Sequence, residues 1–69
     1  MRISARNVIK GRIAKITKGA TTSHVVLQEA GGATITASIT NEAVAELKLK
    51  RGQQAYAVVK ASDVMIGVD

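Results

Sequence analysis

The segment from residue 29 to residue 39, EAGGATITASI, carries the strongest indication of the fold. Gly31 and Gly32 suit the connection of a β-hairpin, because glycine adopts the backbone angles that tight turns require. The residues that follow alternate between apolar and hydroxyl side chains: Ile35, Ala37 and Ile39 against Thr34, Thr36 and Ser38. This two-residue period predicts a strand over residues 33–39, which the hairpin joins to a preceding strand over residues 21–28.

The residues before this hairpin predict a long first strand, from Ile3 to Lys18. Its apolar residues change parity along the way: Ile9 and Ile13 have odd numbers, whereas Ala14 and Ile16 have even numbers. We therefore expect a bend or β-bulge between Gly11 and Lys15, since an extra residue moves the apolar positions back to the same face. The sequence Lys18-Gly19-Ala20 then predicts a turn into the second strand.

The residues after the hairpin predict a short helix and two further strands. Thr40 or Asn41 suits the N-cap of a helix over residues 42–47. Apolar segments over residues 54–59 and 64–68 predict the last two strands. Three strands, a helix and two strands describe an all-β fold with one short helix, a small OB-like five-stranded barrel.

The composition limits how stable this barrel can be on its own. The chain has 69 residues, no cysteine and a single aromatic residue, Tyr56, so we expect one domain over residues 1–69 with a thin aliphatic core. A core of this size rarely contributes more than about 3–5 kcal/mol to stability, which predicts a homo-oligomer. The sequence shows neither a membrane-length apolar run nor a hydrophobic leader, so we expect a cytoplasmic protein without a membrane partner.

Positive charge is concentrated in the N-terminal part of the chain. The net charge is +5, and six cations precede the first acidic residue, Glu29. These cations are Arg2, Arg6, Lys10, Arg12, Lys15 and Lys18. The distribution predicts an anionic partner, for which nucleic acid, an anionic lipid surface and a small oxyanion are the candidates.

The residue types argue against several classes of function. His24, the only histidine, lies in a predicted strand between Ser23 and Val25. No sequence-local partner supports a catalytic role for it, so we expect no enzyme and no catalytic residue. The carboxylates lack the spacing of a ligand set, so no metal site is expected. Binding of single-stranded nucleic acid relies on several aromatic stacking platforms, which Tyr56 alone does not supply.

Two short segments have the residue types that hold a tetrahedral oxyanion. Ser4-Ala5-Arg6-Asn7 combines a hydroxyl, backbone donors and a guanidinium that engages two oxygens at once. Lys60-Ala61-Ser62 adds an ammonium group, a second hydroxyl and the N–H groups of a bent strand end. Judged on spacing alone, a solvated strand face is the alternative interpretation of the same residues.

These segments are part of a wider resemblance to the molbindin family, whose members are built from Mop domains. The similarity covers essentially the whole chain as a single Mop domain. The stretches that carry it are S-A-R-N-x-x-K-G at residues 4–11, Ser38-Ile39-Thr40, Ala43-Val44-x-Glu46-Leu47, and V-V-K-A-S-D-V-M at residues 58–65.

The resemblance implies an OB-like fold and a cytoplasmic hexamer, arranged as a trimer of dimers, that holds molybdate or tungstate at subunit interfaces. One site would use Ser4, Arg6, Lys60, Ala61 and Ser62, with Thr40 from a neighbouring subunit. A second site near the symmetry axes would use backbone N–H groups of Lys18, Gly19 and Ala20. The implied role is storage or buffering of the oxyanion without an organic cofactor, and the alternative is an oxyanion-sensing regulatory module that acts through a partner protein.

Overall fold

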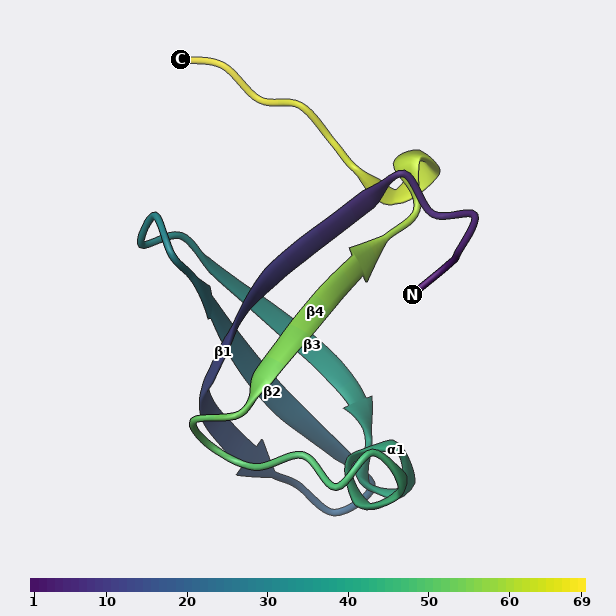
Figure 1. Ribbon diagram of the computed structural model, residues 1–69, viewed down its shortest axis with the longest axis vertical. Coiled ribbons are helices and arrows are strands. Elements are labelled where there is room, and N and C mark those ends of the chain that lie inside the picture. Colours follow the sequence, from purple (N-terminus) through teal and green to yellow (C-terminus); the bar gives the residue numbers. More distant parts are fainter.

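Four antiparallel strands form one curled sheet, a half-barrel with a short helix at one end (Figure 1). The computed structural model describes residues 1–69. In chain order the elements are β1 (Asn7–Lys18), β2 (Thr22–Glu29), β3 (Thr34–Thr40), α1 (Asn41–Glu46), β4 (Gln54–Val59) and a 3₁₀ turn, η1 (Ala61–Asp63). The strand order across the sheet is β3-β2-β1-β4, so β3 and β4 are its two edges. None of the helices has the length and apolar character needed to span a membrane.

Strand β1 holds the two halves of the sheet together. Its first half pairs with β4, from Asn7 opposite Val59 to Arg12 opposite Gln54, and its second half pairs with β2. Gly11 belongs to both pairings, and a Cβ there would lie only 2.5 Å from the carbonyl oxygen of Gln28. Glycine is therefore required where the two ladders meet.

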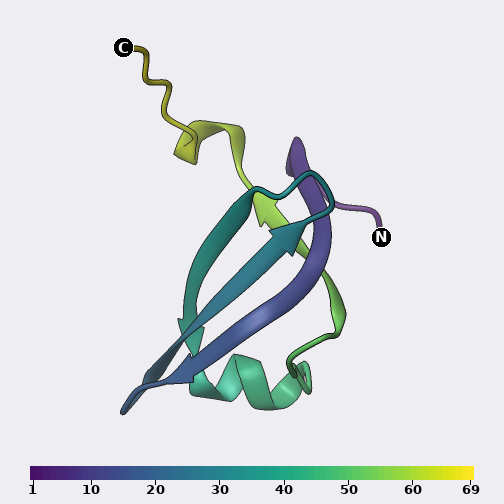
Figure 2. The ribbon, with the colours of Figure 1, turned by 90° about the vertical axis from the view of Figure 1, so that its left-hand side faces the viewer.

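The predicted bulge is confirmed in the second half of β1. Ile13 lies opposite Leu27 and Lys15 opposite Val26, so Ala14 has no partner on β2. The extra residue bends the strand, as the curved path of β1 shows (Figure 2). Apolar residues on both sides of the bulge thus face the concave side of the sheet despite their change of parity.

The core on this concave side is thin, as expected. Ile13, Val25 and Leu27 are its buried members. Partly buried side chains pack around them: Ile16, Ile39, Val44, Leu49, Ala55 and Ala57. The helix contributes through Val44, and Thr40 caps it by accepting a hydrogen bond from the N–H of Ala43 at 3.1 Å. Of the two predicted N-caps, Thr40 and Asn41, the structure has Thr40, and the helix begins one residue earlier than expected, at Asn41.

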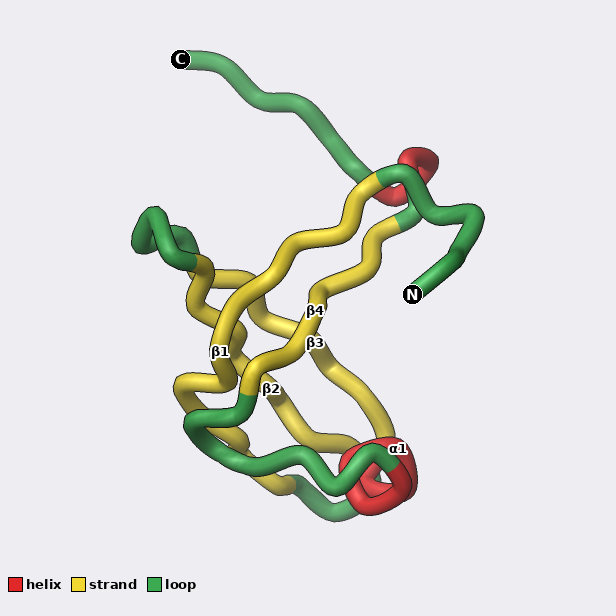
Figure 3. Tube along the Cα trace, viewed as in Figure 1, coloured by secondary structure: helices red, strands yellow, loops and turns green.

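The predicted fifth strand is wrong for this chain. Residues 64–68 follow η1 and run away from the sheet (Figure 3), so they have no neighbouring strand with which to pair. Their side chains are open to solvent, with exposed fractions of 92% for Met65, 88% for Ile66 and 93% for Val68. The barrel is accordingly a half-barrel of four strands, and β1 starts at Asn7 rather than at Ile3. The expected fold class, mostly β with one short helix, is confirmed.

Candidate oxyanion-binding site

The pairing of β1 with β4 brings the two predicted oxyanion segments together. The N-terminal segment precedes β1 and Lys60 follows β4, and the pair Asn7–Val59 closes the ladder next to both. The side-chain amide of Asn7 also donates to the carbonyl oxygen of Val59 at 3.2 Å. A hollow of about 230 Å³ results, lined by Ser4, Ala5, Arg6, Lys60, Ala61 and Ser62.

The lining of this first hollow suits an anion. Arg6 and Lys60 carry positive charge and no carboxylate belongs to the lining. The carbonyl oxygens of Lys60 and Ala61 are engaged around the η1 turn, where they accept from the N–H groups of Asp63 at 2.9 Å and Val64 at 3.3 Å. No backbone hydrogen bond in the structure uses the N–H of Ala61 or Ser62. Two hydroxyls, two cationic groups and two backbone donors thus surround one space, which matches the acceptor-only surface of a tetrahedral oxyanion.

Thr40 and the turn predicted as a second site lie at the other end of β1. Thr40 ends β3, and its hydroxyl is engaged in capping α1. Gly19 and Ala20 connect β1 to β2, and the side chain of Asn41 donates to the carbonyl oxygen of Gly19 at 3.0 Å. Within one chain, Thr40 is therefore grouped with the turn and separated from the first hollow by the twelve-residue strand β1.

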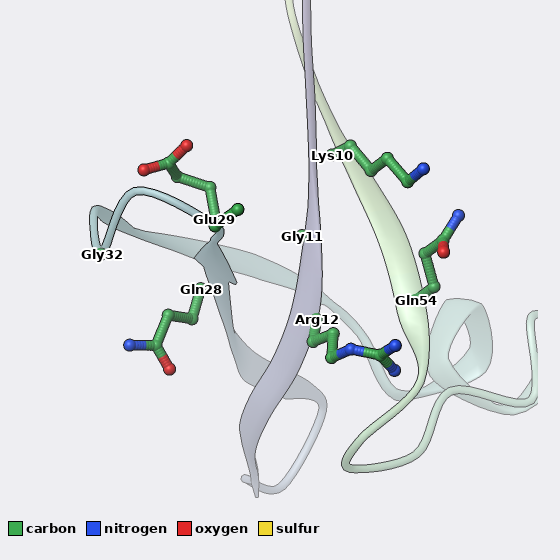
Figure 4. Close-up of a pocket in the computed structure, with 8 residues that line it drawn as sticks. Lys10, Gly11, Arg12, Gln28, Glu29, Gly32 and Gln54 are labelled. Carbon is green, nitrogen blue, oxygen red and sulfur yellow. The ribbon is translucent and has the colours of Figure 1, made fainter.

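A larger hollow of about 660 Å³ lies over the middle of β1, where no site was predicted. Figure 4 shows Lys10, Arg12 and Gln54 on one side of Gly11, with Gln28 and Glu29 on the other. Two of its three charged groups serve the fold: Arg12 donates to the carbonyl oxygen of Gly52 at 3.0 Å, and Glu29 accepts from the N–H of Ala33 at 3.2 Å. The side chains do not converge on one point, so this hollow lacks the arrangement of an oxyanion site.

The remaining polar residues form no second kind of centre. The chain has no group of three or more metal-ligating side chains. His24 is exposed on β2, where it lies between Thr17 of β1 and Ser38 of β3. Asn41 was predicted only as a possible helix cap. Its side chain makes more hydrogen bonds than that of any other residue in the chain.

Comparison with known proteins places the chain in a family. The sequence model of the TOBE domain matches residues 3–66. Molybdenum-pterin-binding protein 2 of Clostridium pasteurianum is 50% identical over 66 residues, which cover 96% of this chain and 97% of that protein. The solved structure of MopII from the same organism, in an apo form, superposes with a TM-score of 0.92 at 48% identity over 97% of this chain and 100% of that one.

A third relative was solved with its ligand. ModG, a cytoplasmic molybdate-binding protein crystallised with molybdate bound, superposes with a TM-score of 0.96 at 49% identity. The match covers all of this chain and 49% of the ModG chain. The relatives are binding proteins, so the expectation that the chain is not an enzyme is confirmed. The chain consists of one TOBE, or Mop, domain and belongs to the molybdenum-pterin-binding proteins, the molbindin family.

Proposed function

We propose that the protein binds molybdate or tungstate reversibly and stores it in the cytoplasm. The observation that carries this proposal is the first hollow, in which Arg6, Lys60 and the Ser4 and Ser62 hydroxyls converge without a carboxylate. The similarity to ModG, whose crystals hold molybdate, supports the same ligand class.

The lining accounts for the chemistry of such a ligand. A tetrahedral dianion has four oxygens, and each accepts hydrogen bonds but donates none. Arg6 would engage two oxygens through its planar guanidinium, while Lys60 supplies a compact charge. The hydroxyls of Ser4 and Ser62 and the N–H groups of Ala61 and Ser62 would complete the shell. No bond to the metal atom is formed, so release requires only the exchange of hydrogen bonds with water.

We propose further that the sites are completed between copies of the chain in a hexamer, a trimer of dimers. Three observations support association. The lining of the first hollow is largely exposed, residues 64–68 present apolar side chains to solvent, and Thr40 lies too far away to join the first site of its own chain. A neighbouring copy would cover the first two and supply Thr40. Arg6 and Lys60 of adjacent subunits would repel one another until the dianion enters, so ligand and assembly would stabilise each other.

The second proposed site is the Lys18-Gly19-Ala20 turn, through the free backbone N–H of Ala20, because the N–H of Gly19 donates to the carbonyl oxygen of Thr22 at 2.8 Å. It carries the charge of Lys18 and lies at the end of the sheet opposite the first hollow. Two kinds of site on one chain would allow one small subunit to contribute to more than one bound anion, as storage requires.

Native mass spectrometry and calorimetry with molybdate, tungstate and sulfate test this function. We expect a hexamer that gains a defined number of molybdate or tungstate ions. It should bind sulfate more weakly, because sulfate is smaller than the other two anions and would fit the same donors less well. A monomer whose mass and heat signal do not respond to molybdate or tungstate would overturn the proposal.

A further inference from the structure

The turn between β1 and β2 has an unusual distribution of hydrogen bonds, and one residue is responsible for it. The side-chain amide of Asn41 donates to the carbonyl oxygen of Gly19 at 3.0 Å and to that of Ala20 at 3.4 Å. The backbone N–H of Asn41 donates to the carbonyl oxygen of Thr21 at 3.0 Å. Asn41 therefore holds three consecutive carbonyls of the turn.

The peptide geometry determines what the turn presents on its other side. In a trans peptide the C=O of one residue and the N–H of the next point in opposite directions. The carbonyls of Gly19 and Ala20 face Asn41, so the N–H groups of Ala20 and Thr21 face away from it. Neither N–H donates a hydrogen bond in the structure. The turn, which follows Lys18 directly in the chain, thus exposes two donors and keeps its acceptors covered.

The orientation of the Asn41 amide is itself fixed by its neighbours. The hydroxyl of Ser23 donates to Oδ1 of Asn41 at 2.5 Å, and Ser23 is 1% exposed. This contact leaves the Nδ2 group directed at the turn, because Oδ1 is already occupied. Thr40 caps α1 directly before Asn41, which anchors its backbone at the first position of the helix.

We propose that Asn41 is a positioning residue for the second oxyanion site. It turns the carbonyls of residues 19–21 away from the ligand, so that the turn offers donors to an anion. This inference rests on the proposed function, in particular on the assignment of the second site to this turn. Asn41 contacts the ligand in neither site. It acts by binding the C=O side of the peptide groups, so that their N–H side faces the ligand.

The alternative is that Asn41 only stabilises the turn, and the two roles predict different results. Without the side-chain donors, the peptide planes of the turn are free to rotate and present carbonyl oxygens, which repel an oxyanion. Loss of a purely structural contact would lower thermal stability and leave the affinity of the folded turn unchanged. The affinity of the second class of sites, measured separately from the first, distinguishes these cases.

The experiment uses the full chain in its native assembly, titrated with sodium molybdate by calorimetry and counted by native mass spectrometry. Asn41→Ala removes the side chain without adding charge. Asn41→Ser keeps a neutral polar side chain that suits the start of a helix, and this side chain is too short to reach the carbonyls of Gly19 and Ala20. Gln53→Ala is the matched control, because its Oε1 accepts one backbone hydrogen bond, from Lys50 at 3.0 Å, outside both proposed sites.

We expect both Asn41 variants to bind at the second class of sites at least tenfold more weakly and to keep the first class within twofold of the unmodified protein. Gln53→Ala should retain both classes. Unchanged second-class affinity in the folded Asn41 variants would overturn the inference, and so would a single class of sites in the unmodified protein. If Asn41→Ala does not fold, Asn41→Ser decides. Absence of molybdate binding at every site of the unmodified protein would instead refute the proposed function.

Discussion

The two ends of the half-barrel differ in how far a single chain completes them. At the end that holds α1, Thr40, Asn41 and Ser23 satisfy the turn and the helix with hydrogen bonds from within the chain. At the opposite end, every residue from 60 to 69 is exposed. One end is thus held together by side-chain hydrogen bonds within the chain, whereas the other presents a charged hollow and an apolar segment to solvent. Under the proposed hexamer, the first end would be stabilised within each chain, and the second end would be the one that association covers.

The largest expected effect comes from charging the uncovered apolar segment. The double variant Met65→Asp/Ile66→Asp should prevent assembly and abolish molybdate binding, because carboxylates would lie where a neighbouring copy is expected to pack. Sedimentation velocity and calorimetry measure both outcomes. The matched control, Ala30→Asp/Ala33→Asp, adds the same charge at the exposed hairpin between β2 and β3 and should assemble normally. An unaltered oligomer of the first variant would show that this segment is not an interface.

The next largest effect concerns the core of the half-barrel, which forms within a single chain. Leu27→Ala removes one of three core side chains and should lower the free energy of unfolding by about 2–5 kcal/mol. Leu47→Ala, at an exposed position after α1, should change it much less. Chemical denaturation gives both values. Equal losses would contradict the view that the thin core carries the intramolecular stability.

At the uncovered end, Arg6→Ala should weaken molybdate binding by about 1.5–3 kcal/mol, roughly 10- to 150-fold, as expected for a charge-assisted hydrogen bond. Arg2→Ala removes the same charge from a position outside the lining and serves as the control. Calorimetry measures the difference. An Arg6→Ala variant with the affinity of the unmodified protein would exclude Arg6 from the site.

The smallest expected effect concerns Thr40, which lies at one end of the half-barrel and is proposed to reach the site at the other end of a neighbouring copy. Thr40→Ala removes the N-cap of α1 and should cost about 0.5–2 kcal/mol of stability in the ligand-free protein. If Thr40 also reaches the first site of a neighbouring copy, the variant should bind molybdate more weakly. Its loss of thermal stability should then be larger with molybdate than without it. Thr40→Ser keeps a hydroxyl and should restore both properties. Thermal unfolding with and without molybdate separates the two contributions, and an equal shift under both conditions would confine Thr40 to its capping role.

Local features of the sequence were sufficient for most of the sheet. The alternation in residues 34–39, the parity change across Ala14 and the hydroxyl of Thr40 each act on near neighbours, so they predicted β3, the bulge and the cap. The segment 64–68 has the composition of a strand but no partner in its own chain, and composition does not reveal whether a partner exists. This is why the fifth strand was predicted and is not formed.

The candidate sites were predicted only in part, because their residues lie far apart in the sequence. Ser4, Arg6 and Lys60 were selected by residue type and by the family resemblance, and the β1–β4 pairing places them around one hollow. Asn41 was missed, since its partners Gly19 and Ala20 are about twenty residues away and only the fold brings them together. An asparagine at the start of a short helix indicates an N-cap. Nothing in the neighbouring sequence indicates that its side-chain amide binds the carbonyls of the turn between β1 and β2.

The unpaired Ala14 sets the relative orientation of the two proposed sites. Deleting it would preserve the alternation of inward and outward side chains, with Ile13 and Ile16 still directed at the core, while straightening β1. Every proposed ligand-binding residue would remain, yet the hollow beside Asn7 and the turn after Lys18 would face in new directions relative to each other. A ring of subunits closes only at particular angles, so in the proposed hexamer the bulge at Ala14 would help to set the angle between neighbouring subunits.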